Sequence, residues 1–175
     1  REKYVKHLYK KLQREGQLER DVDRLVRNDR IAWGSSMIAC KDADAMVTGN
    51  TRRYSSSLEK IAQVVDPRPG EIMFGLNLIV NRGKTIFICD TSVIEYPNAE
   101  QLAEMAKSAA RVVRLFGIDP KIAFLSHSTF GQPATDRTKR LSNAVEILKK
   151  DNVDFKFDGE MQPDVALEEI YKELY

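Results

Sequence analysis

Short β-rich runs alternate with long amphipathic stretches in the second half of this sequence, and this alternation limits the fold more than any other feature. Residues 121–125 (KIAFL) and 155–157 (FKF) are β-rich runs, whereas residues 98–117 and 138–150 carry apolar side chains at helical spacing. Asn98 is suited to cap the first of these helices. A chain that passes repeatedly between strand and helix patterns is typical of an α/β fold.

Two further β-rich runs lie close together, at residues 72–80 and 85–89. The residues between them, Asn81-Arg82-Gly83-Lys84, are typical of a hairpin turn. Together with the alternating strands and helices, this hairpin predicts a mixed, largely parallel sheet with helices on both faces.

The first part of the chain carries mainly helical patterns. The expected helices cover residues 4–12, 18–26, 31–40 and 57–65. Gly16 is expected to end the first helical region, and the breaker cluster at residues 66–70 (DPRPG) ends the last one. Between the third and fourth helices, Ala45-Met46-Val47 is expected to form a short buried strand. Residues 1–30 are therefore a helical lead-in, and residues 31–175 form the central α/β part.

The bulk composition is that of a globular protein, with 175 residues of which 42% are hydrophobic and 31% are charged. The formal net charge of +2 is too small to indicate a nucleic-acid partner. The basic residues among the first thirty positions are interpreted as a solvated helix face. No apolar run reaches the roughly 18 residues of a membrane span, and no signal peptide is visible.

The two cysteines, Cys40 and Cys89, lie within apolar runs, and their spacing fits no metal motif. We therefore expect buried thiols in a reducing compartment, which indicates a cytoplasmic protein. The chain starts at Arg1 rather than at Met and enters a helical pattern directly. This start suggests a fragment of a longer polypeptide.

Polar clusters follow three of the expected strands, and in open α/β sheets ligands bind beyond the carboxyl ends of strands. The first cluster offers a Gly turn, two arginines and a helix start, which together suit a phosphate group. Its candidate ligand-binding residues are Thr48, Gly49, Asn50, Arg52 and Arg53. A surface turn with helix-capping serines would explain the same pattern, and the spacing alone does not decide between the two readings.

The second cluster contributes Ser126, Ser128 and Thr129 as candidate ligand-binding residues. His127 could act as a general base, but a hydrogen bond to the adjacent loop is the commoner role of such a residue. Asp158 and Glu160 follow the last strand and are a poor acid/base pair. No phosphate-binding Walker motif and no dinucleotide fingerprint occurs, and no metal site or catalytic residue is assigned.

Three stretches together resemble the phosphotransacetylase (phosphate acetyl/butyryltransferase) family. They are DADAMVTGNTRRYSSSLEKIAQVV, FICDTSVIEYPNAEQLAEMAKSAARVVRLFGIDPKIAFLSHSTFG and FDGEMQPDVAL, which occur in the family's order. Their variants are most similar to the C-terminal phosphotransacetylase-like domain of bacterial NADP-dependent malic enzymes. The resemblance implies an isocitrate-dehydrogenase-like α/β fold, of which this chain is an incomplete fragment of a two-subdomain unit, without the N- and C-terminal parts of the full domain.

The resemblance also implies a cleft in which acetyl-CoA and phosphate meet. Two departures bear on activity. The arginine that helps the family to hold phosphate aligns with Glu59, and a carboxylate at that position would repel a phosphate dianion. The Ser-Arg and Asp residues that activate the CoA thiol belong to a later segment than Tyr175.

These departures favour a regulatory, acetyl-CoA-binding domain over an active enzyme. By resemblance, the full-length protein would be a malic enzyme that converts malate to pyruvate and CO2 with NADP and a divalent metal, Mg or Mn, bound outside this fragment. The expected partners are acetyl-CoA or a related effector, the malic-enzyme domain of the same chain and further copies in a homo-oligomer. The alternatives are a fragment of an active phosphate acetyltransferase and a purely structural dimerisation domain.

Overall fold

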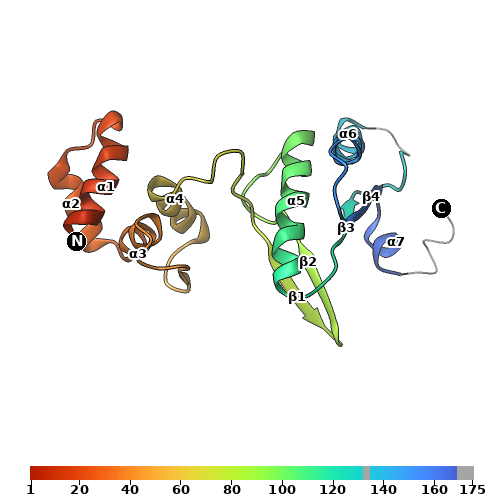
Figure 1. Cartoon of the computed structure of the whole chain (residues 1–175), viewed down its shortest axis with the longest axis horizontal. Helices are drawn as coiled ribbons and strands as arrows, with labels where there is room; N and C mark the ends of the chain where they lie inside the picture. The colour runs from red at the N-terminus through yellow and green to blue at the C-terminus, as the bar shows by residue number, and fades with distance from the viewer. Residues whose placement is uncertain (132–134, 169–175) are drawn as a thin grey trace. The chain divides into compact units, whose positions relative to one another are not determined.

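The computed structural model describes residues 1–131 and 135–168. It divides into two compact units, residues 1–67 and residues 68–175. The α-helices and strands of both units are labelled in Figure 1.

The first unit is helical. Its elements are α1 (Glu2–Leu12), the short 3-10 helix η1 (Gln13–Glu15), α2 (Glu19–Asn28), α3 (Arg30–Ala39) and α4 (Tyr54–Val64). Gly16 follows η1 with a φ of 81°, in the left-handed conformation that glycine adopts most easily, so the predicted end of this helical region is confirmed.

One apolar cluster holds the four α-helices of this unit together. Its buried members are Val5, Leu8, Leu12, Val22, Val26, Ala32 and Val64. Full burial of an aliphatic side chain stabilises the fold by roughly 1.5–3 kcal/mol, so this cluster outweighs the exposed ion pairs around it. One such ion pair joins Lys11 of α1 to Asp66, with the Nζ and Oδ1 atoms 2.7 Å apart.

The short buried strand predicted at Ala45-Met46-Val47 is wrong. The structure has no strand there, and the Val47 side chain is fully exposed. Of the three residues Ala45, Met46 and Val47, Met46 alone is half-buried. Its sulfur lies so close to Gly34 that a Cβ at Gly34 would be 2.5 Å away. Three consecutive apolar residues are too few to specify a strand, and packing of one side chain onto α3 decides the local structure instead.

The second unit contains all the strands of the described residues. The hairpin strands β1 (Asn77–Asn81) and β2 (Lys84–Ile88) are antiparallel, with Asn81 opposite Lys84. Arg82 and Gly83 have φ values of 47° and 80°, as a two-residue hairpin turn of type I′ requires. The predicted hairpin is confirmed, although its first strand begins at residue 77 rather than at residue 72.

The remaining elements of this unit are α5 (Ala99–Leu115), β3 (Lys121–Leu125), α6 (Asp136–Lys150), β4 (Lys156–Met161) and α7 (Pro163–Leu167). Asn98 caps α5 as predicted: its side chain accepts a hydrogen bond from the Gln101 N–H at 2.8 Å, and the Gln101 side chain accepts one from the Asn98 N–H at 2.9 Å. Strands β3 and β4 pair in parallel, so the mixed α/β architecture is confirmed, with its strands divided between two two-stranded sheets.

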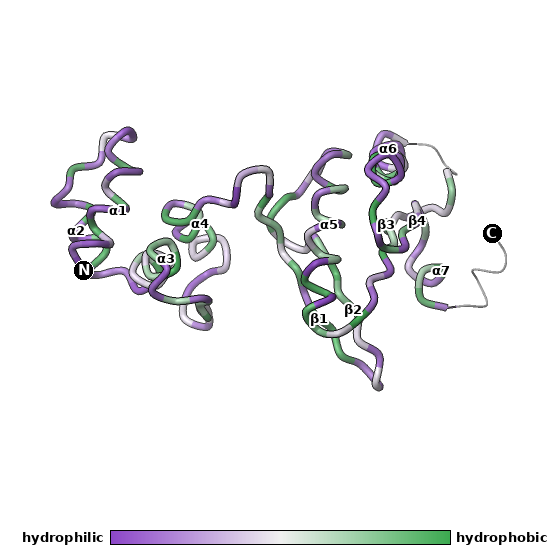
Figure 2. Tube along the Cα trace, in the orientation of Figure 1, coloured by the Kyte–Doolittle hydropathy of each residue, from purple (hydrophilic) through white to green (hydrophobic). Residues whose placement is uncertain are grey.

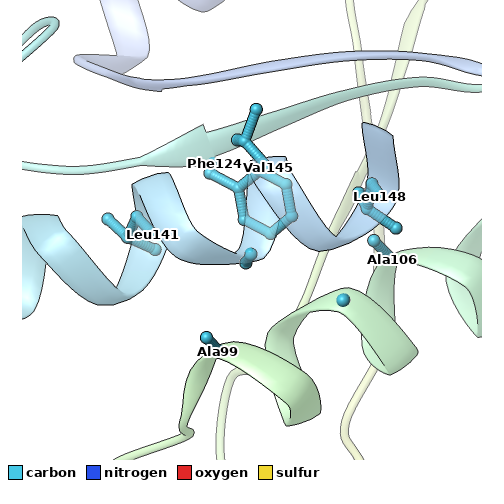
Figure 3. Close-up of a cluster of buried hydrophobic side chains, with 8 residues drawn as sticks. Ala99, Ala106, Phe124, Leu141, Val145 and Leu148 are labelled. Carbon is cyan, nitrogen blue, oxygen red and sulfur yellow. The ribbon is translucent and has the colours of Figure 1, made fainter. Parts of the chain in front are cut away.

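The core of the second unit lies between α5, α6 and strand β3. Figure 3 shows Ala99 and Ala106 of α5, Phe124 of β3, and Leu141, Val145 and Leu148 of α6. The apolar stripe of α5 is therefore core rather than surface, although Leu115 at its end is exposed. Further apolar side chains are exposed on the hairpin, whose hydropathy is coloured in Figure 2: Leu78, Ile79, Val80 and Ile88.

The side chain of Asp90 organises the segment after β2. Its Oδ1 accepts hydrogen bonds from the backbone N–H groups of Gly75, Ser92 and Val93, and its Oδ2 accepts one from Ile94. Desolvation opposes ionisation of this carboxyl, but the four N–H donors outweigh it and lower the pKa of Asp90.

The prediction of two buried thiols is wrong, because Cys40 is half-buried and Cys89 is exposed. Each lies at or just beyond the end of an element, where an apolar neighbourhood in the sequence does not imply burial. In the described part of the chain, no helix is long and apolar enough to cross a membrane.

Candidate functional site

A pocket of about 450 Å³ lies between α3 and the loop that follows it. The loop contributes four of the predicted site residues, Thr48, Gly49, Asn50 and Arg52. Gly49 has a φ of 140° and Asn50 a φ of 63°, so the turn depends on residues that tolerate positive φ. These four residues therefore line one concave surface, and their binding of a phosphate stays a prediction.

The opposite wall of this pocket comes from the first turns of α3. Arg30, Ile31 and Gly34 line it, and Met46, whose sulfur approaches Gly34, is a further lining residue. Arg30 and Arg52 are both exposed, and both belong to the residues that line the pocket. Guanidinium groups hold phosphate and carboxylate oxygens with several parallel N–H donors, which makes an anion the chemically matched ligand.

Arg52 forms an ion pair with Asp29, an acidic residue that the sequence analysis did not assign to the site. The Nη1 of Arg52 donates to the Oδ2 of Asp29 at 2.6 Å. The Oδ1 of Asp29 caps α3 and accepts from the N–H groups of Ile31 at 2.8 Å and Ala32 at 3.0 Å. Burial opposes the charge of Asp29, but the bonds from Arg52, Ala32 and Ile31 outweigh it and lower the pKa of Asp29. An Asp directly before a helical pattern is an N-cap signal, so the cap could have been found. Its contact with Arg52, 23 residues away, could not.

The other two predicted residues of this region do not line the pocket. Arg53 immediately precedes α4, and Glu59 lies on an exposed face of that helix. The pocket is bounded by α3 rather than by the start of α4, which the sequence interpretation had favoured. The carboxylate of Glu59 is therefore not part of the wall formed by residues 46–52.

The second predicted cluster forms a polar turn after β3. Ser128 is buried, and its N–H and Oγ both lie 3.4 Å from the Oγ of Ser126. The Oγ of Thr129 accepts a hydrogen bond from the Gln162 N–H at 3.2 Å. The exposed His127 is 3.4 Å from the Oγ of Ser126 through its Nδ1. These contacts lie within the turn and between the turn and Gln162.

Asp158 and Glu160 lie within β4 rather than after the last strand, so that expectation is wrong, and Glu160 is buried beside the turn that follows β3. Strands β3 and β4 shift register after Phe124, and Glu160 is the additional residue at this bulge. Its Oε1 accepts from the Gly131 N–H at 2.8 Å, while its buried Oε2 has no hydrogen-bond partner among residues 1–131 and 135–168. Asp158 is exposed. The two carboxylates thus lie in different environments, Glu160 buried and Asp158 exposed.

The two predicted clusters belong to different units of the structure. Thr48, Gly49, Asn50 and Arg52 lie in the first unit, whereas Ser126, Ser128 and Thr129 lie in the second. Within residues 1–131 and 135–168, no three His, Cys, Asp or Glu side chains gather in a way that could hold a metal ion.

The chain is similar to known proteins over almost its whole length. The family model for Phosphate acetyl/butaryl transferase matches residues 1–174. The chain is 45% identical over 172 residues to an NADP-dependent malic enzyme of Rhizobium meliloti, covering 98% of this chain and 23% of that protein. It is 30% identical over 146 residues to a phosphate acetyltransferase of Nitratidesulfovibrio vulgaris, covering 83% of this chain and 21% of that protein.

The fold of the chain is also similar to that of solved structures. A phosphotransacetylase from Streptococcus pyogenes superimposes with a TM-score of 0.84 at 27% identity, and covers 98% of this chain and 53% of its own. The chain thus spans about half the length of that structure and about a quarter of the curated relatives.

Proposed function

This chain belongs to the phosphate acetyl/butaryl transferase family, and we propose that it is a regulatory, acetyl-CoA-binding domain of an NADP-dependent malic enzyme that does not itself transfer acetyl groups. The observation that carries the proposal is the pocket between α3 and residues 46–52. It presents Arg30 and Arg52 beside a Gly turn, and it contains no residue in the role of a nucleophile with an adjacent base. Such a pocket can bind an anion but has no visible means to activate one.

The chemistry of acetyl-CoA suits these walls. Its phosphates carry the charge that two guanidinium groups attract, and Thr48 and Asn50 add polar side chains to the same wall. The volume of about 450 Å³ lies within the usual range for small-molecule sites and is sufficient for part of a CoA molecule. Glu59, at the position where the resemblance puts a phosphate-binding arginine, supports the loss of acyl transfer.

In this proposal the malic-enzyme reaction takes place elsewhere in the full-length protein. NADP and the divalent metal would bind there, because the described residues of this chain offer neither a metal-ligand cluster nor a dinucleotide fingerprint. Acetyl-CoA bound to this domain would lower the rate of malate oxidation.

We also propose that the protein forms a homo-oligomer, which the exposed apolar residues of β1 support. A cytoplasmic location is proposed as well, supported by two cysteines that form no disulfide.

Calorimetric titration of acetyl-CoA into the full-length protein, together with NADPH formation from malate, tests the proposal. We expect saturable binding and a lower rate of malate oxidation. Arg52→Gln should weaken both effects, whereas Arg53→Gln serves as the matched control, because Arg53 is the neighbouring arginine outside the pocket. Absence of both binding and inhibition would contradict the proposal. If both variants kept full regulation, a purely structural dimerisation domain would be the better explanation.

An active phosphate acetyltransferase is the second candidate, favoured by the similarity to the Nitratidesulfovibrio vulgaris protein. It predicts that the full-length chain forms acetyl phosphate from acetyl-CoA and phosphate. The regulatory proposal predicts acetyl-CoA binding without this product, so a single assay of acetyl phosphate distinguishes the two.

A further inference from the structure

We infer that Asp29 is a positioning residue that fixes the guanidinium of Arg52 at the wall of the α3 pocket, so that an anionic ligand meets an arginine already in place. This inference rests on the proposed anion-binding function of the pocket. It adds a second residue whose contribution to binding passes through Arg52 rather than through contact with the ligand.

The first support is the way in which Asp29 is itself held. Its Oδ1 accepts two backbone N–H bonds from the first turn of α3, at 2.8 and 3.0 Å. Its side chain is only 14% exposed. A carboxylate tied to a helix in this manner has one orientation, and its free oxygen, Oδ2, is therefore a fixed point to which Arg52 is attached.

The second support is the relative placement of the two side chains. Arg52 lines the pocket, whereas Asp29 does not. The contact of 2.6 Å uses the Nη1 of Arg52. Since a guanidinium has five N–H donors, four further donors remain for an anion. The acid thus holds the arginine from outside the ligand space and leaves most of its hydrogen-bonding capacity open.

The third support concerns conformational freedom. Arg52 belongs to a loop without helix or strand structure, and its side chain is 38% exposed. An unrestrained arginine on such a loop would have to be ordered when the ligand binds, which weakens affinity. Ordering one long side chain typically changes affinity by roughly threefold to tenfold, and we expect the effect of Asp29 in this range.

The same contact could instead oppose ligand binding, since Asp29 neutralises Arg52 and would compete with an anion for it. The two roles predict opposite results when the charge of Asp29 is removed. Competition predicts tighter binding, and positioning predicts weaker binding.

The test is calorimetric binding of acetyl-CoA to the full-length protein and its Asp29→Asn and Asp29→Ser variants. Asn and Ser both cap helices well, so α3 keeps its cap and the fold is retained, which thermal unfolding verifies. Asn turns an amide donor toward Arg52, and Ser is too short to reach it. Asp23→Asn is the control, because Asp23 pairs with Arg27 at 2.7 Å and does not line the pocket.

We expect both Asp29 variants to bind roughly threefold to tenfold more weakly and the control to bind as the unmodified protein does. A double-mutant cycle with Arg52→Gln separates positioning from a general structural effect. If Asp29 acts through Arg52, Asp29→Asn weakens binding no further once Arg52 is replaced. Tighter binding, unchanged binding, or an equal further loss in the Arg52→Gln background would each overturn the inference.

The experiment distinguishes a wrong effector from a wrong role of Asp29. If the unmodified protein does not bind acetyl-CoA, the proposed function is wrong, and the same cycle is then measured with inorganic pyrophosphate as the probe. Weaker pyrophosphate binding in the Asp29 variants would support the inference independently of acetyl-CoA. Absence of binding by both compounds would overturn the inference together with the proposed function.

Discussion

Replacement of Asp90 by Asn is predicted to loosen the segment that joins β2 to α5. In the native protein the carboxylate accepts four backbone hydrogen bonds, three at Oδ1 and one at Oδ2. Asn keeps one oxygen, which can still serve three of the four donors. Its NH2 group would face the N–H of Ile94, now 2.6 Å from Oδ2, so two donors would oppose each other.

The expected cost follows from this loss of one bond to a charged acceptor. Such a bond contributes about 1.5–3 kcal/mol, and the half-buried position of Asp90 argues for about 2 kcal/mol. Since every 1.4 kcal/mol is a factor of ten, local opening should become roughly 30-fold more frequent. Amide hydrogen exchange measures this opening directly at Gly75, Ser92, Val93 and Ile94, whose N–H groups are the donors.

The effect should also depend on pH. The pKa of Asp90 is lowered in the folded state, so its contribution is fully present above the ordinary Asp pKa of about 3.9. It is lost as the pH falls through the lowered folded pKa. The difference in protection between native protein and Asp90→Asn should therefore be constant near neutral pH and shrink in acid below about pH 4.

Asp119→Asn is the matched control, because Asp119 is an exposed aspartate of the same unit and its replacement should change stability by less than about 0.5 kcal/mol. The reasoning would be refuted if the four amides of Asp90→Asn exchanged within threefold of the native rates, or if the control variant exchanged as fast as Asp90→Asn.

Three further outcomes are expected. Gly159→Ala should destabilise the protein by about 2 kcal/mol or more in thermal unfolding, because Gly159 has a φ of 140° and its new Cβ would lie 2.8 Å from the Cβ and the carbonyl oxygen of Phe124; an unchanged melting temperature would contradict this. Lys107→Met, which removes the contacts with Asp151 at 2.6 Å and with Glu104 at 3.7 Å, should cost at most about 1 kcal/mol, since all three side chains are partly exposed; a larger loss in chemical denaturation would show that these pairs are worth more than surface ion pairs usually are. Glu59→Arg should change the affinity for acetyl-CoA by less than about threefold in calorimetry and should produce no acetyl phosphate, because Glu59 lies on an exposed face of α4 outside the α3 pocket; a larger change in affinity would argue that the ligand also contacts α4.

Local signals in the sequence were sufficient wherever a few neighbouring residues decide the conformation. The cap at Asn98 and the turn at Arg82-Gly83 were found because an N-cap and a type I′ turn are each satisfied within four residues. Pro163 likewise occupies the first turn of α7, where its missing N–H costs nothing. The mixed α/β class followed from the alternation of such elements.

The motif stretches are sufficient to indicate the family without the fold, because the family's residue pattern extends over almost the whole chain. Periodicity failed at Val47 for the opposite reason. Three apolar residues have no period of their own, and their environment is set by whichever surface the loop meets, here Gly34 of α3 through Met46.

Only the tertiary structure decided which residues form the candidate site. Asp29 and Arg52 are 23 positions apart and meet because α3 and its following loop pack against each other. The same packing makes Arg30 part of the pocket and leaves Arg53, next to Arg52 in the chain, outside it. Glu160 is buried because a register shift adds one residue to β4. The sequence gives the residue types at these positions but not their contacts. Their contacts depend on the path of the backbone, which forms only when distant apolar surfaces pack together and exclude water.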